Sequence, residues 1–148
     1  MTVKTRPLAP TDRTDWEGLF AGYAAFYKVD QTPQMRETVF GWLMDDTHSS
    51  NCIVAEDAEG RLIGFTHFRP FVSQLRANTN CFLDDLFVDP AARGSGAAQA
   101  LIGAVKTVSQ DKGWGTVRWI TAEDNYRGRA VYDKLATRTP WVTYDIKL

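Results

Sequence analysis

The residues with the clearest chemical meaning lie in one segment, residues 81–102. It contains two adjacent carboxylates, Asp84 and Asp85, then Pro90, and then the loop Arg-Gly-Ser-Gly, which opens directly into an alanine-rich helix. The first N–H groups of a helix lack intrahelical acceptors, and the helix dipole is positive there. A strand that leads through a glycine-containing loop into such a helix can hold a phosphate. The segment therefore predicts a site for a cofactor that carries a diphosphate.

The spacing of the loop narrows the choice of cofactor. Residues 93–98 read R-x-x-G-x-A, which is neither the G-x-x-x-x-G-K-[ST] phosphate loop nor the dinucleotide pattern G-x-G-x-x-G. The string resembles the coenzyme A pyrophosphate loop of the GNAT superfamily of N-acetyltransferases, Q/R-x-x-G-x-G/A. Residues 83–90 also match that family's strand pattern L-x-D-L-x-V-x-P, and Asn125 is followed seven positions later by Tyr132. The resemblance covers residues 81–148 and is closest to the small histone and polyamine acetyltransferase branch.

The resemblance implies an α+β fold of the GNAT type, also described as mixed α/β. Its central sheet is mixed but mostly antiparallel, helices flank it, and a V-shaped splay between the fourth and fifth strands admits the pantetheine arm of the cofactor. An antiparallel meander followed by one strand-helix-strand crossover agrees with this fold. We expect one such domain over residues 1–148.

The same resemblance assigns the cofactor, acetyl-CoA as a cosubstrate, to particular positions. The backbone of three strand residues would pair with the pantetheine amides as an added strand does. Six loop residues would hold the pyrophosphate, and small side chains there let the backbone approach it. Asn125 either contacts the pantetheine or only caps the helix that follows. The expected strand residues are Leu86, Phe87 and Val88, and the expected loop residues are Arg93, Gly94, Ser95, Gly96, Ala97 and Ala98.

Acetyl transfer to an amine needs a neutral amine and a proton for the departing thiolate. A lysine-like amine has a pKa of about 10.4, so it must lose a proton before or during attack. Asp84 or Asp85 would act as the base through water, and strand alternation would send their side chains to opposite faces, so that one faces the cleft. Tyr132 matches the family's general acid, although its place on an apolar helix face also suits simple packing.

Candidates for binding the acceptor come from the region outside the resemblance. We name Tyr27, His67 and Glu123 as substrate-binding residues, each with a plainer alternative as a core or surface side chain. Further cleft candidates are Tyr23, Trp42, Asp45 and Asp46.

Hydrophobic periodicity and turn residues predict the elements that position these groups. A polar connection is expected over residues 69–80. Strands are expected over residues 3–8, 51–56, 62–68, 81–88, 116–121 and 142–147, and helices over residues 16–27, 33–45, 98–112 and 126–135.

Composition limits the class of protein. The chain has 148 residues, 44% hydrophobic and 24% charged, with a net charge of -1. No basic block stands out, which argues against a nucleic-acid partner. The two cysteines lie in apolar runs without partners at metal-ligand spacing, so we expect buried free thiols and no metal. Neither a signal region nor a membrane span is visible, which makes the cytoplasm the expected location.

We therefore predict a cytoplasmic N-acetyltransferase that moves acetyl directly to an amine, without a covalent acetyl-cysteine. The acceptor would be a primary amine of a small molecule, such as a polyamine or an amino acid, or a lysine side chain. A homodimer follows from the resemblance alone. The alternatives are a non-catalytic acyl-CoA sensor, an enzyme for longer acyl groups, and a histone-type lysine acetyltransferase.

Overall fold

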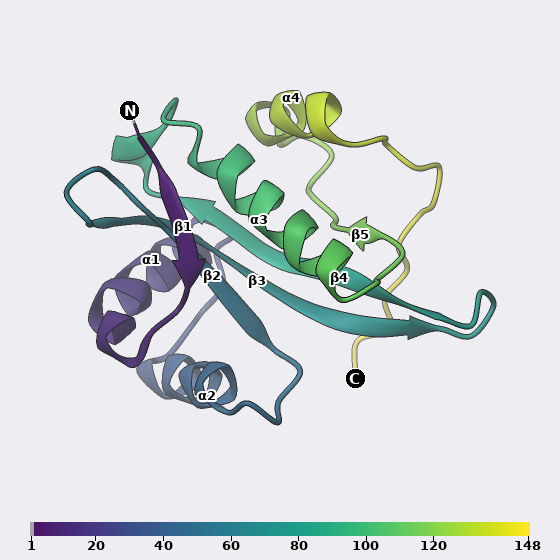
Figure 1. Cartoon of the computed structure of the whole chain (residues 1–148), viewed down its shortest axis with the longest axis horizontal. Coiled ribbons are helices and arrows are strands. Elements are labelled where there is room, and N and C mark those ends of the chain that lie inside the picture. Colours follow the sequence, from purple (N-terminus) through teal and green to yellow (C-terminus); the bar gives the residue numbers. More distant parts are fainter. Residues whose placement is uncertain (1) are drawn as a thin grey trace.

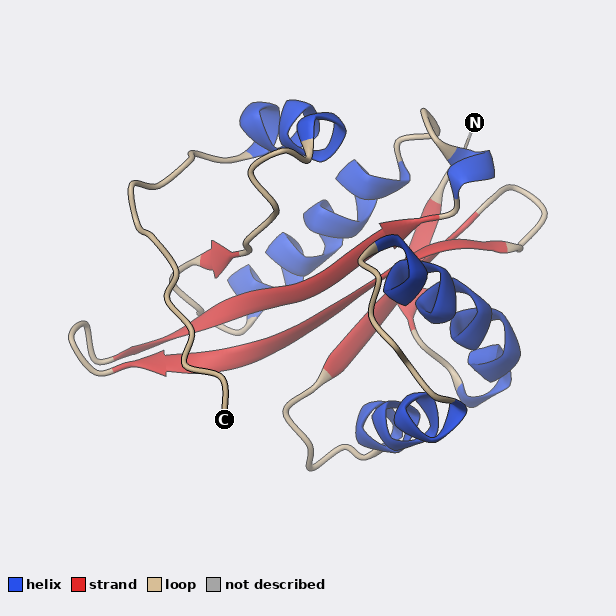
Figure 2. Ribbon diagram, turned by 180° about the vertical axis from the view of Figure 1, so that it is seen from behind, coloured by secondary structure: helices blue, strands red, loops and turns tan. Residues whose placement is uncertain are grey.

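The protein is built on one five-stranded sheet in the order β1-β2-β3-β4-β5, with helices on both faces (Figures 1 and 2). The computed structural model describes residues 2–148, so Met1, part of the domain expected over residues 1–148, lies outside them. The first four strands are antiparallel neighbours, and the last is parallel to the strand beside it. The strands are β1 (Lys4–Pro7), β2 (Asn51–Glu56), β3 (Leu62–Ser73), β4 (Asn78–Val88) and β5 (Val117–Arg118).

The helices divide between the two faces of this sheet (Figure 1). On one face lie α1 (Arg13–Phe26) and α2 (Pro33–Met44), and on the other lies α3 (Ala97–Asp111), with α4 (Tyr126–Leu135) beside it. Short 3-10 turns, η1 (Pro10–Asp12) and η2 (Pro90–Ala92), precede α1 and α3. This is the mixed, mostly antiparallel α+β architecture that the sequence predicts.

Each face of the sheet has its own apolar core. Against α1 and α2 lies a largely aromatic cluster that includes Trp16, Phe20 and Phe65. Against α3 lies a largely aliphatic cluster that includes Leu83 and Leu101. The start signal of α2 also holds, since the Thr32 hydroxyl accepts a hydrogen bond from the backbone N–H of Met35 at 3.2 Å, whereas Asp12 makes no such bond at the start of α1.

The polar connection expected over residues 69–80 is wrong. β3 continues to Ser73 and β4 begins at Asn78, so the two strands form a long hairpin. The Phe71 and Phe82 rings meet edge to face with centroids 6.2 Å apart, which stabilises the extension. Because the pairing of β2 with β3 ends at Phe68, β3 has a free edge at Pro70, where a proline is tolerated.

The two strands expected near the C-terminus differ from the structure. The strand expected over residues 116–121 pairs only at Val117 and Arg118. Residues 142–147 are extended but form no strand, so that prediction is wrong. Alternating apolar residues indicate a strand only where an edge is available to pair with, and this segment pairs with no edge in residues 2–148.

Candidate active site

The last residues of β4 form an open edge. β5 pairs only with Cys81 and Phe82, so residues 83–88 have β3 on one side and no strand on the other. This is the expected splay. Leu86 and Val88 pack toward the α3 core, whereas Phe87 packs toward α1. A free edge of this kind can hydrogen-bond an extended amide-containing chain.

The loop between β4 and α3 has the conformation of an anion site. Gly94 and Gly96 have φ values of +80° and +86°, and nothing lies within 4 Å of a Cβ added at either, so it is the positive φ that requires glycine. The backbone N–H groups of Gly94, Gly96, Ala98 and Gln99 have no acceptor in residues 2–148. Together with the positive end of the α3 dipole, they fit a pyrophosphate.

Of the other loop residues, Ser95 and Ala97 stabilise the loop, and Arg93 is exposed to solvent. The Ser95 hydroxyl accepts a hydrogen bond from the Ala97 N–H at 3.3 Å, and Ala97 is buried beneath the loop. Arg93 is exposed, so its guanidinium is available to solvent or to an anion. The loop therefore offers an anion several backbone N–H donors and one exposed positive charge.

A β-bulge brings Asp84 and Asp85 into the same pocket. The register of β3 and β4 shifts between His67 and Phe68, so Asp85 lies opposite His67, Leu83 lies opposite Phe68, and Asp84 is the extra residue between them. Both carboxylates then line one pocket. The expectation that their side chains point to opposite faces is therefore wrong, because it assumed unbroken alternation.

Asp85 is held by a chain of two hydrogen bonds that ends in the aromatic core. The indole Nε1–H of Trp16 donates to Nε2 of His67 at 3.1 Å, and Nδ1 of His67 lies 2.8 Å from Oδ2 of Asp85. Because Nε2 accepts, the imidazole proton is on Nδ1 and is donated to Asp85. Trp16 and His67 are both buried, which fixes the orientation of the carboxylate.

Asp84 has a different partner, Arg69. The Arg69 Nε lies 3.1 Å from each Asp84 carboxylate oxygen, and the guanidinium lies 5.1 Å from the centroid of the Phe82 ring. Burial raises the pKa of Asp84, and the positive charge of Arg69 opposes that rise. The two carboxylates of the bulge therefore have different partners: Asp85 contacts the neutral His67, and Asp84 contacts the guanidinium of Arg69.

These groups line a pocket of about 470 Å³ between α2, the residues that precede β2, and the strands β3 and β4. Of the sequence-predicted residues, Asp84, Asp85, His67 and Trp42 line it. Its wall combines four apolar side chains with seven polar ones, so it can offer a small molecule both apolar contact and several hydrogen-bonding groups. The full lining is Phe20, Val39, Trp42, Leu43, His48, Ser49, Ser50, His67, Arg69, Asp84 and Asp85.

Two tyrosines of α1 and its C-terminal end lie near Asp85, since the rings of Tyr23 and Tyr27 are 5.0 Å apart and Asp85 acts on the Tyr23 hydroxyl. Burial raises the pKa of Tyr23, and nearby Asp85 raises it further. Burial also raises the pKa of Tyr132, with a further contribution from Tyr27. Tyr132 is half-buried and meets the Trp119 ring edge to face at 5.5 Å. Tyr27 is 42% exposed and lies outside the pocket lining.

Asn125 caps α4, and Glu123 lies apart from the pocket. The Asn125 Oδ1 accepts from the Gly128 N–H at 3.2 Å, and its Nδ2 donates to the Thr121 hydroxyl at 2.9 Å. A Cβ at position 128 would lie 2.5 Å from that Nδ2, which explains the glycine. Glu123 is exposed, and its backbone carbonyl accepts from Arg129.

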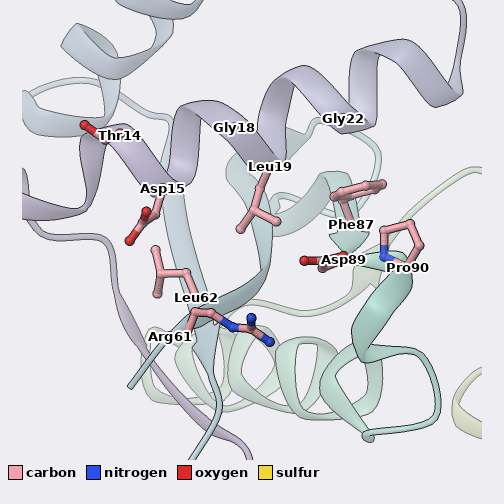
Figure 3. Close-up of a pocket in the computed structure, with 10 residues that line it drawn as sticks. All are labelled: Thr14, Asp15, Gly18, Leu19, Gly22, Arg61, Leu62, Phe87, Asp89 and Pro90. Atoms are coloured by element: carbon pink, nitrogen blue, oxygen red, sulfur yellow. The ribbon is translucent and has the colours of Figure 1, made fainter. Parts of the chain in front are cut away.

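A second hollow, of about 420 Å³, lies between α1 and the ends of β3 and β4 (Figure 3). Of the sequence-predicted site residues only Phe87 lines it, and the charged residues around it are Asp15 of α1, Arg61 just before β3 and Asp89 just after β4. Gly22 of α1 lies close to the ring of Phe87, since a Cβ added at Gly22 would lie 3.2 Å from that ring. None of the residues predicted to bind the acceptor lies here.

Arg69 and Trp16 are among the residues of the site that the sequence did not predict. Arg69 lies two positions after His67 and so faces the same side of the sheet, a signal that alternation offered. Trp16 lies at the start of the helix expected over residues 16–27, and no sequence pattern shows that its N–H meets a histidine.

The model of the acetyltransferase (GNAT) family matches residues 16–136. The chain belongs to this family. It is an N-acetyltransferase, as its curated relatives also indicate. D-amino-acid N-acetyltransferase HPA3 of Saccharomyces cerevisiae is 29% identical over 143 residues, which cover 96% of this chain and 89% of that protein. The uncharacterised N-acetyltransferase YhfO of Bacillus subtilis is 31% identical over 116 residues, which cover 78% and 76% of the two chains.

Solved structures share the whole fold. A structure of AAC(6')-Iy in complex with the bisubstrate analogue CoA-S-monomethyl-acetylneamine superposes with a TM-score of 0.85 at 22% identity, and covers 100% of this chain and 99% of that one. At this identity the likeness supports the fold and no finer statement. No helix in the described residues is long and apolar enough to cross a membrane.

Proposed function

We propose that this N-acetyltransferase moves the acetyl group of acetyl-CoA directly to the primary amine of a small molecule. The observation that carries the proposal is the position of Asp85. It lines the acceptor pocket and stands immediately before the open β4 edge, residues 86–88, where the cofactor would bind. With the base on the pocket wall and the cofactor bound along the neighbouring strand edge, the amine would lie between the base and the acetyl group that it attacks.

Asp85 is the base in this proposal. Its Oδ2 accepts from His67, which leaves Oδ1 to take the amine proton, directly or through water. His67 cannot take that proton in this geometry, because Nδ1 is already protonated and Nε2 accepts from Trp16. His67 is therefore a positioning residue that acts through Asp85, rather than the substrate-binding residue expected from the sequence.

The cofactor, when bound, supplies the acetyl group as a thioester. The backbone of Leu86, Phe87 and Val88 would hold its pantetheine, and the N–H groups of the loop at residues 93–98 would hold its pyrophosphate. The amine nitrogen bonds to the acetyl carbon as the carbon–sulfur bond breaks, and Asp85 takes the amine proton. Tyr132 gives its hydroxyl proton to the departing sulfur. Because burial raises the pKa of Tyr132, this hydroxyl stays protonated at neutral pH.

Direct transfer is supported by the state of the two thiols. Cys52 and Cys81 are both buried, and burial raises the pKa of each thiol above its ordinary value. A thiolate is the nucleophilic form of cysteine. Neither residue is therefore suited to carry the acetyl group on its sulfur.

The test is thiol release from acetyl-CoA with a panel of amino acids, polyamines, simple amines and lysine peptides. We expect turnover with a small amine, and we expect Asp85→Asn to lower kcat/KM by about 10²- to 10⁴-fold while acetyl-CoA affinity stays unchanged. Asp111→Asn, which changes an exposed carboxylate at the end of α3 and outside the pocket lining, is the matched control and should behave as wild type.

Other outcomes would replace the proposal. Acetyl-CoA binding without turnover on any acceptor would favour the sensor alternative. Turnover with lysine peptides alone would favour a histone-type lysine acetyltransferase. Faster turnover with longer acyl-CoAs would favour an enzyme for longer acyl groups.

We also propose a homodimer and keep the cytoplasm as the expected location. The homodimer is supported by the C-terminal residues, since Val142, Tyr144 and Ile146 are 73%, 90% and 89% exposed in the single chain. Alternating exposed apolar residues of this kind mark a strand that lacks a partner. Light scattering should give twice the chain mass for the whole protein and the single chain mass for a variant that ends at Pro140. A monomeric wild type would contradict the homodimer.

A further inference from the structure

Arg69 has unused hydrogen-bonding capacity inside the acceptor pocket. It is the one arginine or lysine among the residues that line the pocket. Only its Nε is engaged, by the two oxygens of Asp84, and neither Nη has an acceptor in residues 2–148. A guanidinium carries five N–H donors. Four of them are therefore free to meet a ligand.

The guanidinium is also held in place without being covered. Asp84 fixes it from one side, and the Phe82 ring lies 5.1 Å from it. The side chain stays 42% exposed. A fixed, planar and partly exposed guanidinium with free Nη groups is the arrangement that recognises a carboxylate through two parallel hydrogen bonds.

The pocket thus offers two opposite charged positions and an apolar wall. Asp85 presents a free oxygen to an ammonium, and Arg69 presents its Nη groups to an anion. Val39 and Leu43 of α2 and Phe20 of α1 supply apolar surface in the same pocket. A ligand that carries one ammonium, one carboxylate and an apolar side chain satisfies all three features.

We infer that the acceptor is an α-amino acid with an apolar or aromatic side chain, bound by Arg69 through its carboxylate. This inference rests on the proposed acetyl transfer to a small amine and names the acceptor class. The ammonium lies at Asp85 and releases one proton to water before attack, Asp85 takes the second proton as the amide forms, and the product is an N-acetyl amino acid. Asp84 then has its own purpose, because it orients Arg69 and leaves Asp85 to meet the ammonium.

The assignment separates amino acids from polyamines by charge. A polyamine carries several positive charges, and Arg69 would repel the second of them. An amine without a carboxylate would leave the Nη groups without their ligand. Losing a charge-assisted pair costs an acceptor about tenfold to a hundredfold in kcat/KM.

The experiment compares phenylalanine, in both enantiomers, with phenethylamine and spermidine as acceptors of the whole enzyme. Phenethylamine has the same amine and ring but no carboxylate. We expect the better phenylalanine enantiomer to exceed phenethylamine by about tenfold or more in kcat/KM. In Arg69→Gln this advantage should fall to about one, mainly through a higher KM for phenylalanine, while the turnover of phenethylamine changes little.

Arg118→Gln is the matched control, because Arg118 also lies over an aromatic ring, that of Phe71 at 5.7 Å, but does not line the pocket. It should keep the wild-type preference. Equal or better use of phenethylamine or spermidine by the wild type would overturn the amino-acid assignment while leaving amine acetylation intact. A preference for phenylalanine that survives in Arg69→Gln would overturn the role of Arg69. Acetyl-CoA binding with no turnover on any amine would overturn the proposed function and this inference together.

Discussion

The first 118 residues and the last 30 are packed very differently. α1 buries Trp16, Phe20 and Ala24, and α3 buries five residues, whereas α4 buries none. No residue between 119 and 148 is buried, and no salt bridge among the described residues involves this C-terminal part. Both parts nevertheless contribute to the proposed site, because the proposed base, Asp85, lies in the first and the proposed acid, Tyr132, in the second.

This difference indicates that stability and chemistry are distributed unevenly. The packed part, residues 2–118, contains the buried residues of both apolar cores and the proposed acceptor pocket. The C-terminal part contributes the proposed acid from a helix with few contacts of its own. Elements with few buried contacts open at low free energy. We therefore expect a bound cofactor or a second subunit to stabilise the C-terminal part more than the packed part.

The largest effect should come from the aromatic core. Phe65 is fully buried between β3 and α1, so Phe65→Ala should lower the free energy of unfolding by about 3–5 kcal/mol. Leu135→Ala in α4, at a position 45% exposed, should lower it by about 1 kcal/mol or less. Urea unfolding of both variants measures this contrast. Similar losses for the two would show that α4 is as well packed as the core.

Next in size is the effect of removing the proposed acid. Tyr132→Phe keeps the ring against Trp119 but removes the hydroxyl, so kcat should fall by about 100-fold while acetyl-CoA affinity and unfolding free energy stay nearly unchanged. Steady-state kinetics and calorimetry measure the two quantities. A large loss of cofactor affinity with little change in kcat would make Tyr132 a packing residue.

The smallest effect concerns an ion pair within the packed part. Arg6 contacts Asp12 through two hydrogen bonds of 2.7 and 2.9 Å, and they lower the pKa of that buried carboxyl. A lowered pKa stabilises the fold above the ordinary carboxyl pKa, and this contribution is lost as the pH falls through the lowered value. Asp12→Asn should therefore destabilise the protein by about 1–2 kcal/mol at pH 7, and the difference should shrink below pH 4. A difference that does not change with pH would assign the effect to packing.

Sequence reasoning performed best where the pattern is local. The four helices, the hairpin of β2 and β3, and the glycines of the loop before α3 follow from periodicity, caps and turn residues. It failed where a neighbour decides the outcome. Residues 142–147 alternate like a strand but have no edge to pair with, and Pro70 is tolerated only because β2 has already ended.

The site shows the same division. The motif positions predicted the open edge of β4 and the free N–H groups of the loop. The bulge at Asp84 could not be predicted, because an extra residue in one strand has no recognisable signature in the sequence. Once the bulge is present, Arg69 and Trp16 find their partners, and neither partnership has a sequence signature.

The burial of the tryptophans gives each part of the molecule its own optical reporter. Trp16 is fully buried, whereas Trp141 is 80% exposed near the C-terminus. An indole in an apolar core emits at shorter wavelengths than one in water, and only the exposed one is quenched by iodide. Iodide titration of the intact enzyme should therefore report mainly on Trp141 in the C-terminal segment and on the 43% exposed Trp42 at the pocket, while the unquenched blue emission reports on the core beside His67. A fluorescence experiment on a Trp42→Phe variant can thus follow the ordering of the tail and the integrity of the core beside the candidate site at the same time.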